Sequence, residues 1–151
     1  MKINFTKAAV AGIAGTILFD LAGFALTGTF WDIPALLGVK LIGEGGFALG
    51  VLVHYGNGVA LAVIYAALAP SLWGSDHLRA LTYITVQTVV GVYLFMLPLL
   101  GAGIFGHKLG LLVPVIVMAR HWAYALALAW LYPVAARTEA RPALNTVKQP
   151  A

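Results

Sequence analysis

The chain has 151 residues, of which 62% are hydrophobic and 9% are charged, with a formal net charge of +4. Its mean hydropathy of +0.94 excludes an ordinary soluble globular domain and is typical of an integral membrane protein. The cations flank apolar stretches instead of forming one basic cluster, so we predict no nucleic-acid partner. The absence of cysteine excludes disulfides, thiolate metal sites and a cysteine nucleophile.

The first predicted membrane helix covers residues 8–27, with Asp20 near its middle. A carboxylate at this depth is costly unless it finds a partner inside the protein. The apolar run is long for a signal peptide, so we expect this helix to be retained. Residues 28–46 are too polar and too rich in glycine to span. Asp32 followed by Pro34 favours a short helix there, lying along the outer interface.

The second span is predicted at residues 47–69, where His54 and Asn57 lie one turn apart on the same face. The third span is predicted at residues 78–100. Its one strongly polar interior residue is Gln87, and Pro98 predicts a kink near its outer end.

The fourth span is predicted at residues 110–134, with Arg120 and His121 at its midpoint. A fixed charge at bilayer depth must face a protein interior or a water-filled cavity. Counted along their helices, Asp20 and Arg120 lie at similar depths. We therefore predict that Asp20 neutralises Arg120, directly or through one water.

Positive charges predict the orientation in the membrane. Two cations, Lys40 and Lys108, lie on one side, and six lie on the side of the termini: Lys2, Lys7, Arg79, Arg137, Arg141 and Lys148. Cytoplasmic loops are enriched in lysine and arginine, so both termini are predicted to be cytoplasmic. Residues 1–136 form the predicted transmembrane domain, and residues 137–151, with two prolines, form a disordered cytoplasmic tail.

The second and fourth spans resemble each other at an offset of 67 residues. Residues 54–65, HYGNGVALAVIY, share histidine, Ala-Leu-Ala and tyrosine with residues 121–132, HWAYALALAWLY. This predicts an all-α four-helix bundle built from two parallel helix hairpins, about 8–70 and 75–134, related by an axis along the membrane normal. His54 and His121 would then lie at equal depth.

The motif H-x-x-N-G with a later tyrosine, the segment PLLGAGIFG, and a last helix containing histidine, Tyr124 and Leu131-Tyr132 together suggest a family. Over roughly residues 8–134 the chain resembles small four-pass bacterial inner-membrane proteins catalogued as a domain of unknown function. A glycine often precedes the last-helix histidine in that family, where this sequence has Arg120. The resemblance implies a fold and a location in the bacterial inner membrane, and no activity.

A buried polar centre is predicted from the polar residues of all four spans: Asp20, His54, Asn57, Gln87, Arg120, His121 and Tyr124. The preferred interpretation is a structural network in a non-enzymatic accessory subunit, which contacts lipid and other membrane subunits or further copies of itself and holds no cofactor or metal. One alternative is a b-type haem held by His54 and His121. Another is an oligomeric transporter that couples a small solute to protons. No H-E-x-x-H or G-x-S-x-G motif indicates an enzyme.

Overall fold

The computed structural model describes residues 3–134, so the predicted tail at 137–151 lies outside the described residues. This part of the chain is mostly helical and has no strand. Its α-helices are α1 (Phe5–Thr27), α2 (Asp32–Ile42), α3 (Phe47–Leu68), α4 (Asp76–Gln87), α5 (Leu97–Leu99) and α6 (Val113–Leu131). Short 3₁₀ turns, η1 (Ala69–Ser71) and η3 (Ile104–Gly106), follow α3 and precede α6.

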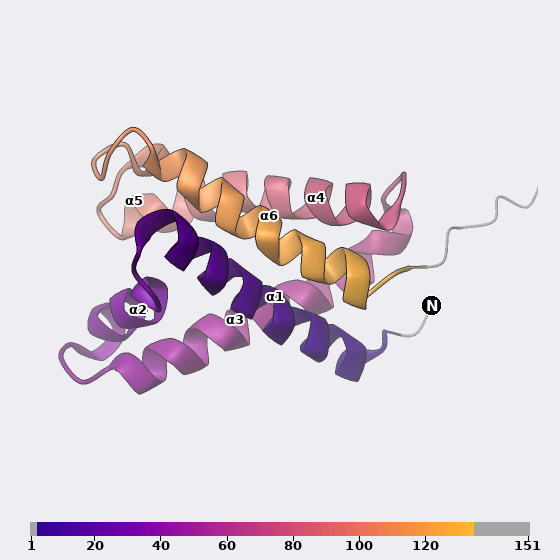
Figure 1. Cartoon of the computed structure of the whole chain (residues 1–151), viewed down its shortest axis with the longest axis horizontal. Coiled ribbons are helices and arrows are strands. Elements are labelled where there is room, and N and C mark those ends of the chain that lie inside the picture. The colour runs from indigo at the N-terminus through magenta and orange to yellow at the C-terminus, as the bar shows by residue number, and fades with distance from the viewer. Residues whose placement is uncertain (1–2, 135–151) are drawn as a thin grey trace, which may run out of the picture.

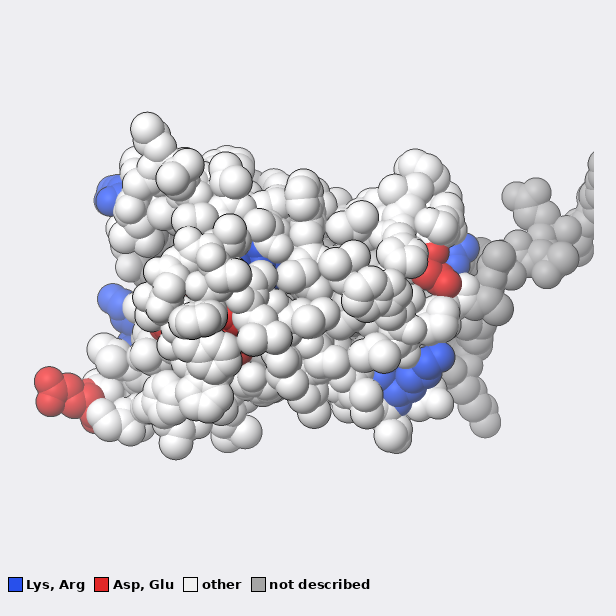
Figure 2. All heavy atoms as spheres, in the orientation of Figure 1, with Lys and Arg blue, Asp and Glu red and all other residues white. Residues whose placement is uncertain are grey.

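Four helical stretches are long and apolar enough to cross a membrane: Phe5–Thr27, Phe47–Ser71, Asp76–Leu99 and Val113–Leu131. The predicted four-transmembrane-helix bundle is therefore confirmed. Large apolar side chains such as Leu52, Phe95 and Trp130 are exposed on its flanks. Figure 2 shows charged side chains mainly at the two ends of the molecule, with a largely uncharged band between them. This distribution suits a surface surrounded by lipid.

The third span is one continuous helix in which a π-helical segment, η2 (Thr88–Met96), joins α4 to α5. Ser75 caps its beginning by accepting a hydrogen bond from the Leu78 amide at 3.4 Å. Pro98 lies in the last turn, where the helix ends. The kink predicted at Pro98 stays a prediction.

The helices pack in the order α3, α1, α6, α4, with α2 lying against α3 (Figure 1). Asn4 and Tyr132 meet at one end of the bundle, where the Asn4 amide donates to the tyrosine hydroxyl at 3.3 Å. We call this the terminal end, and the opposite end, which carries α2 and η3, the loop end. α3 and the third span meet where the Tyr83 hydroxyl donates to the Leu61 carbonyl at 2.9 Å and the ring centroids of Tyr65 and Tyr83 are 5.5 Å apart.

This packing departs from two-fold symmetry. An axis that relates α1 to the third span and α3 to α6 would make the interface of α1 with α6 equivalent to that of the third span with α3. The first of these interfaces is extensive, whereas over residues 3–134 the second is narrow. The two-hairpin repeat therefore stays a prediction from the sequence.

A hydrogen-bonded cluster closes the terminal end. The Arg79 guanidinium donates to the carbonyls of Leu72 and Val134, each at 3.0 Å, and to the Asp76 carboxylate at 3.4 Å. Asp76 also accepts from the Val134 amide at 3.0 Å. Arg79 is buried. It therefore ties the loop after α3 to the end of α6.

Candidate functional site

Arg120 is the centre of a buried ion-pair network. Its two terminal nitrogens each donate to one carboxylate oxygen of Asp32 at 2.7 Å, and one of them lies 3.9 Å from the Asp20 carboxylate. Such a bidentate pair is stronger and more directional than a single contact. The sequence predicted Asp20 as the partner, and that prediction was incomplete, because Asp32 makes the shorter contacts.

Helix geometry explains why Asp32 can reach a residue in the middle of α6. Helical side chains lean toward the N-terminus of their helix, and for α6 that is the loop end, where α2 begins. The guanidinium lies against Gly23 of α1, where any side chain would clash with it. It also lies over the Phe19 ring, with the guanidinium carbon 4.4 Å from the ring centroid, which adds a cation–π contact. Because Gly23 has no side chain, the Arg120 guanidinium can lie against α1.

Asp32 is ionised in this setting. Burial alone raises the pKa of its carboxyl, but the hydrogen bonds and positive charge of Arg120, together with the Ile33 amide, outweigh burial and lower the pKa below its ordinary 3.8. The Ile33 amide donates to the carboxylate at 2.8 Å. Asp32 therefore carries its negative charge throughout the physiological range.

Asp20 is held mainly by α3. It is 1% exposed, and its carboxylate lies 3.0 Å from Nε2 of His54 and accepts from the Tyr55 hydroxyl at 3.3 Å. The network therefore links four elements, with Asp20 on α1, Asp32 on α2, His54 on α3 and Arg120 on α6.

Phe19 contacts the two histidines that were predicted to lie at equal depth. Its ring centroid is 5.5 Å from that of His54 and 4.9 Å from that of His121. The residues present do not fit a haem held by both, because Asp20 engages Nε2 of His54, the atom that would coordinate iron. Within residues 3–134, no three histidine, aspartate or glutamate side chains are grouped to hold a metal ion.

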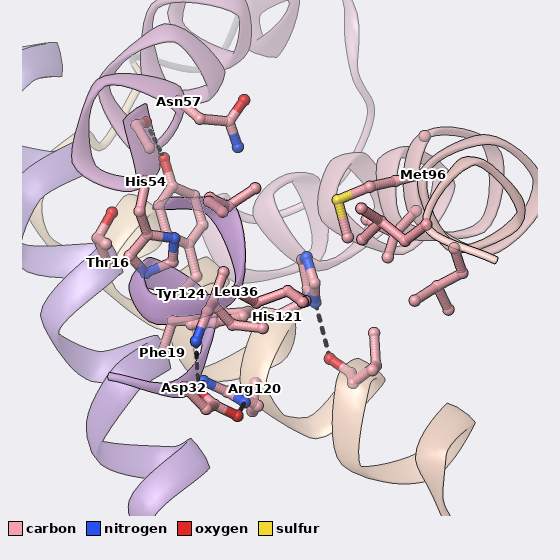
Figure 3. Close-up of a pocket in the computed structure, with 18 of the residues that line it drawn as sticks. Thr16, Phe19, Asp32, Leu36, His54, Asn57, Met96, Arg120, His121 and Tyr124 are labelled. Carbon is pink, nitrogen blue, oxygen red and sulfur yellow. Dashed lines mark hydrogen bonds and ion pairs between the residues drawn. The ribbon is translucent and has the colours of Figure 1, made fainter. Parts of the chain in front are cut away.

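Beside the network lies a cavity of about 660 Å³, between α3 and the third span and bounded also by α1, α2 and α6 (Figure 3). Most of its lining is aliphatic and aromatic. Six of the seven residues of the predicted polar centre line it: His54, Asn57, Gln87, Arg120, His121 and Tyr124. Asp20 does not line the cavity and lies behind His54.

The polar groups of the cavity differ in how they are satisfied. The Tyr124 hydroxyl donates to the Gly58 carbonyl at 2.6 Å, and the Thr16 hydroxyl donates to the Gly12 carbonyl at 2.9 Å, so both serve helix packing. Asn57, predicted as part of the buried centre, is exposed and makes no side-chain hydrogen bond among the described residues. The Oε1 of Gln87 and the Nε of Arg120 are buried and have no partner in this part of the chain. Natural proteins leave few buried polar atoms unpaired, so these groups point to a function.

Sequence reasoning missed Asp32, Thr16 and Phe19 as parts of the site. For Asp32 a signal was available, because it is one of five acidic residues in the chain and lies just beyond the outer end of the first span. Its position two residues before Pro34 favoured a role in starting α2, and it is the first residue of that helix. For Thr16 and Phe19 the sequence offers no signal beyond a place on a membrane helix.

The fold and the site together define a four-span helical membrane protein with a buried ion-pair network beside an internal cavity. Comparisons of the chain with protein-family models, with curated proteins and with solved structures found no match. The resemblance to four-pass inner-membrane proteins of unknown function stays a prediction.

Proposed function

We propose that this protein is a non-enzymatic integral membrane protein that binds a small, largely apolar molecule in the cavity between α3 and the third span. The observation that carries the proposal is the cavity itself, whose volume of about 660 Å³ lies in the range of small-molecule sites. Its lining also has the character of such sites, because a mainly apolar wall carries a few convergent polar groups.

A purely structural role for the polar centre accounts less well for these features. A network that only fixes helix packing is expected to satisfy its own members, as Tyr124 and Thr16 do. The cavity is partly open to its surroundings, so a molecule could enter it, and its apolar lining lacks packing partners across the open space. A bound molecule would restore the missing contacts.

The role of an accessory subunit in a larger membrane complex, or in a homo-oligomer, is compatible with this proposal. A ligand held between spans can be supplied to, or shared with, a neighbouring subunit. The bacterial inner membrane is the location that the cation bias and the family resemblance support.

Proton-linked solute transport is a second candidate, and the contact between Asp20 and His54 favours it. A carboxylate and an imidazole 3.0 Å apart can exchange a proton, and His54 also lines the cavity. In this version the cavity would be the solute site, and a proton gradient across liposomes would drive accumulation of the solute.

The proposal is tested by filling the cavity. Val117 lines the cavity on α6, whereas Val115, two residues earlier, is 65% exposed on the outside of the bundle. We expect a photoactivatable octylphenyl diazirine to label the wild-type protein saturably at cavity residues. Val117→Phe should remove the saturable labelling, and the matched variant Val115→Phe should retain it.

Both variants are first shown to have the wild-type melting temperature and to be monodisperse in the same detergent. Labelling that does not saturate in the wild type, or that persists unchanged in Val117→Phe, would overturn the proposal.

A further inference from the structure

The hydrogen-bonding groups on the cavity wall specify the chemistry of its ligand, if the cavity binds one as proposed above. We infer that the ligand is an uncharged amphiphile with a hydroxyl group, and that His121 accepts the hydrogen bond from that hydroxyl. The inference rests on the proposed function and goes further, because it names the class of ligand and the atom that recognises it.

The orientation of His121 supplies the acceptor. Its Nδ1 lies 2.7 Å from the Val117 carbonyl oxygen, and a carbonyl only accepts, so Nδ1 carries the proton and donates. In the neutral ring the other nitrogen, Nε2, is then an acceptor. Figure 3 shows that this nitrogen points away from the carbonyl, into the open space between Asn57 and Met96. Within the described part of the chain, it has no hydrogen-bond partner.

Asn57 supplies a donor on the opposite wall. Its amide extends from α3 toward the same open space (Figure 3). An asparagine amide donates through nitrogen and accepts through oxygen. A hydroxyl group can donate to His121, and it can also accept from an amide such as that of Asn57. A ketone or an ether only accepts, and it would leave Nε2 of His121 desolvated and unpaired.

The ion-pair network excludes a charged head group. Both terminal nitrogens of Arg120 are taken by Asp32, and its Nε is buried. Asp20 is 1% exposed behind His54, and Asp32 is neutralised by Arg120. Over residues 3–134, the cavity lining therefore offers no free charge to pair with an ion. Burying an unpaired ionic group is far more costly than burying a hydroxyl.

The test compares two probes that differ in one hydrogen-bond donor, 4-octylphenol and its methyl ether, 4-octylanisole. Each competes with the photoactivatable diazirine for labelling of the purified full-length protein. We expect the phenol to compete about tenfold better than the ether, because the ether leaves the histidine acceptor unsatisfied. His121→Asn should reduce the phenol to the level of the ether without changing the ether itself, because the shorter asparagine side chain does not reach the position of Nε2.

His107→Asn is the matched control. Its Nδ1 also contacts a carbonyl one turn away, that of Ile104 at 3.0 Å, but it lies at the loop end outside the cavity lining. This variant should retain the preference for the phenol. Should His121→Asn fail to fold, the ¹⁵N resonance of Nε2 in the wild type is measured instead. It should move when the phenol is added and stay unchanged with the ether.

The outcomes separate this inference from the function on which it rests. Equal competition by phenol and ether, abolished by Val117→Phe, would leave the cavity as a binding site and overturn recognition of a hydroxyl. A preference that survives in His121→Asn, or a resonance that does not move, would overturn the assignment of His121. Competition by neither probe would overturn the inference, and saturable diazirine labelling would still report on the cavity.

Discussion

At the scale of single residues, Arg120 joins two carboxylates of unequal character. Asp32 makes two contacts of 2.7 Å and its side chain is 31% exposed, whereas Asp20 is 3.9 Å away and almost completely buried. Asp20 has partners of its own in His54 and Tyr55. Loss of Arg120 therefore leaves Asp32 without its main partner, and loss of Asp20 leaves Arg120 still paired.

We expect Arg120→Gln to destabilise the protein, but by less than the roughly 3–5 kcal/mol typical of a fully buried pair, because the Asp32 side chain is 31% exposed. In double-mutant cycles, the coupling of Arg120 with Asp32 should exceed its coupling with Asp20. Arg120→Gln combined with Asp32→Asn should therefore recover more stability than the combination with Asp20→Asn. The measurement is reversible unfolding in mixed micelles. A larger coupling with Asp20 would contradict the geometry described above.

Much of this site could be predicted from the sequence, because a charge in a membrane helix needs a partner. Depth along the helices predicted that Asp20 and Arg120 lie near each other. It did not predict the bidentate contact with Asp32, because that residue follows a loop, where helical periodicity carries no information about position. Its place in the site depends on how α2 packs against α3, and that is a tertiary contact.

At the scale of the elements, α2 is positioned by close backbone contact with α3. Gly38, Gly46 and Gly50 lie where a side chain would collide with backbone atoms of the other helix. This contact holds Asp32 in reach of Arg120 and places Ile33, Leu36 and Leu37 on the cavity wall. The glycine-rich segment that lies between the first and second spans therefore forms one side of the site.

Two alanine substitutions on α3 test this contact. A side chain at Gly50 would clash with the Pro34 carbonyl, whereas no atom lies within 4 Å of the position it would take at Gly56. Gly50→Ala should lower the melting temperature and weaken diazirine labelling of the cavity. Gly56→Ala should leave both unchanged or raise stability by up to about 1 kcal/mol, since alanine favours a helix over glycine. Equal effects at the two positions would contradict the packing.

The third span shows a limit of sequence reasoning at this scale. Its length and apolar character were predictable, but the π-helical register of Thr88–Met96 was not. Hydropathy indicates which residues are buried in lipid or protein, but it does not indicate which backbone carbonyl accepts the hydrogen bond from each amide. The segment begins directly after Gln87, and Gly91, Val92 and Met96 from it line the cavity. Such local irregularities are frequent at functional sites.

At the scale of the whole molecule, an even number of spans brings the two ends of the described chain to one side. The amide of Asn4 meets the hydroxyl of Tyr132, and the Lys7 amine lies 5.5 Å from the centre of the same ring. Four apolar spans were predictable from composition, but their neighbours were not. In a membrane bundle, a helix face is apolar whether it contacts lipid or another helix. The sequence therefore carries no pattern of polar and apolar residues from which the packing order could be derived.

The orientation in the membrane stays a prediction from the cation bias. A reporter active only in the periplasm should be inactive when fused before residue 3 or after residue 134. It should be active when inserted in the loop at residues 101–110. Fusions of a reporter that fluoresces only in the cytoplasm provide the converse control. Periplasmic activity at either terminus would reverse the assignment.

The position of Arg120 in the last span has a consequence for the synthesis of the protein. Chains are made from the N-terminus, so Asp20 and Asp32 reach the membrane before Arg120, the cation that pairs with them. Until α6 emerges, the first hairpin carries three carboxylates, Asp20, Asp32 and Glu44, and no arginine. When Arg120 arrives, its acceptors are already in place, which lowers the cost of inserting a charged helix into lipid. The first hairpin is consequently an incomplete unit during biogenesis, and the arginine that pairs with its carboxylates arrives only with the final span.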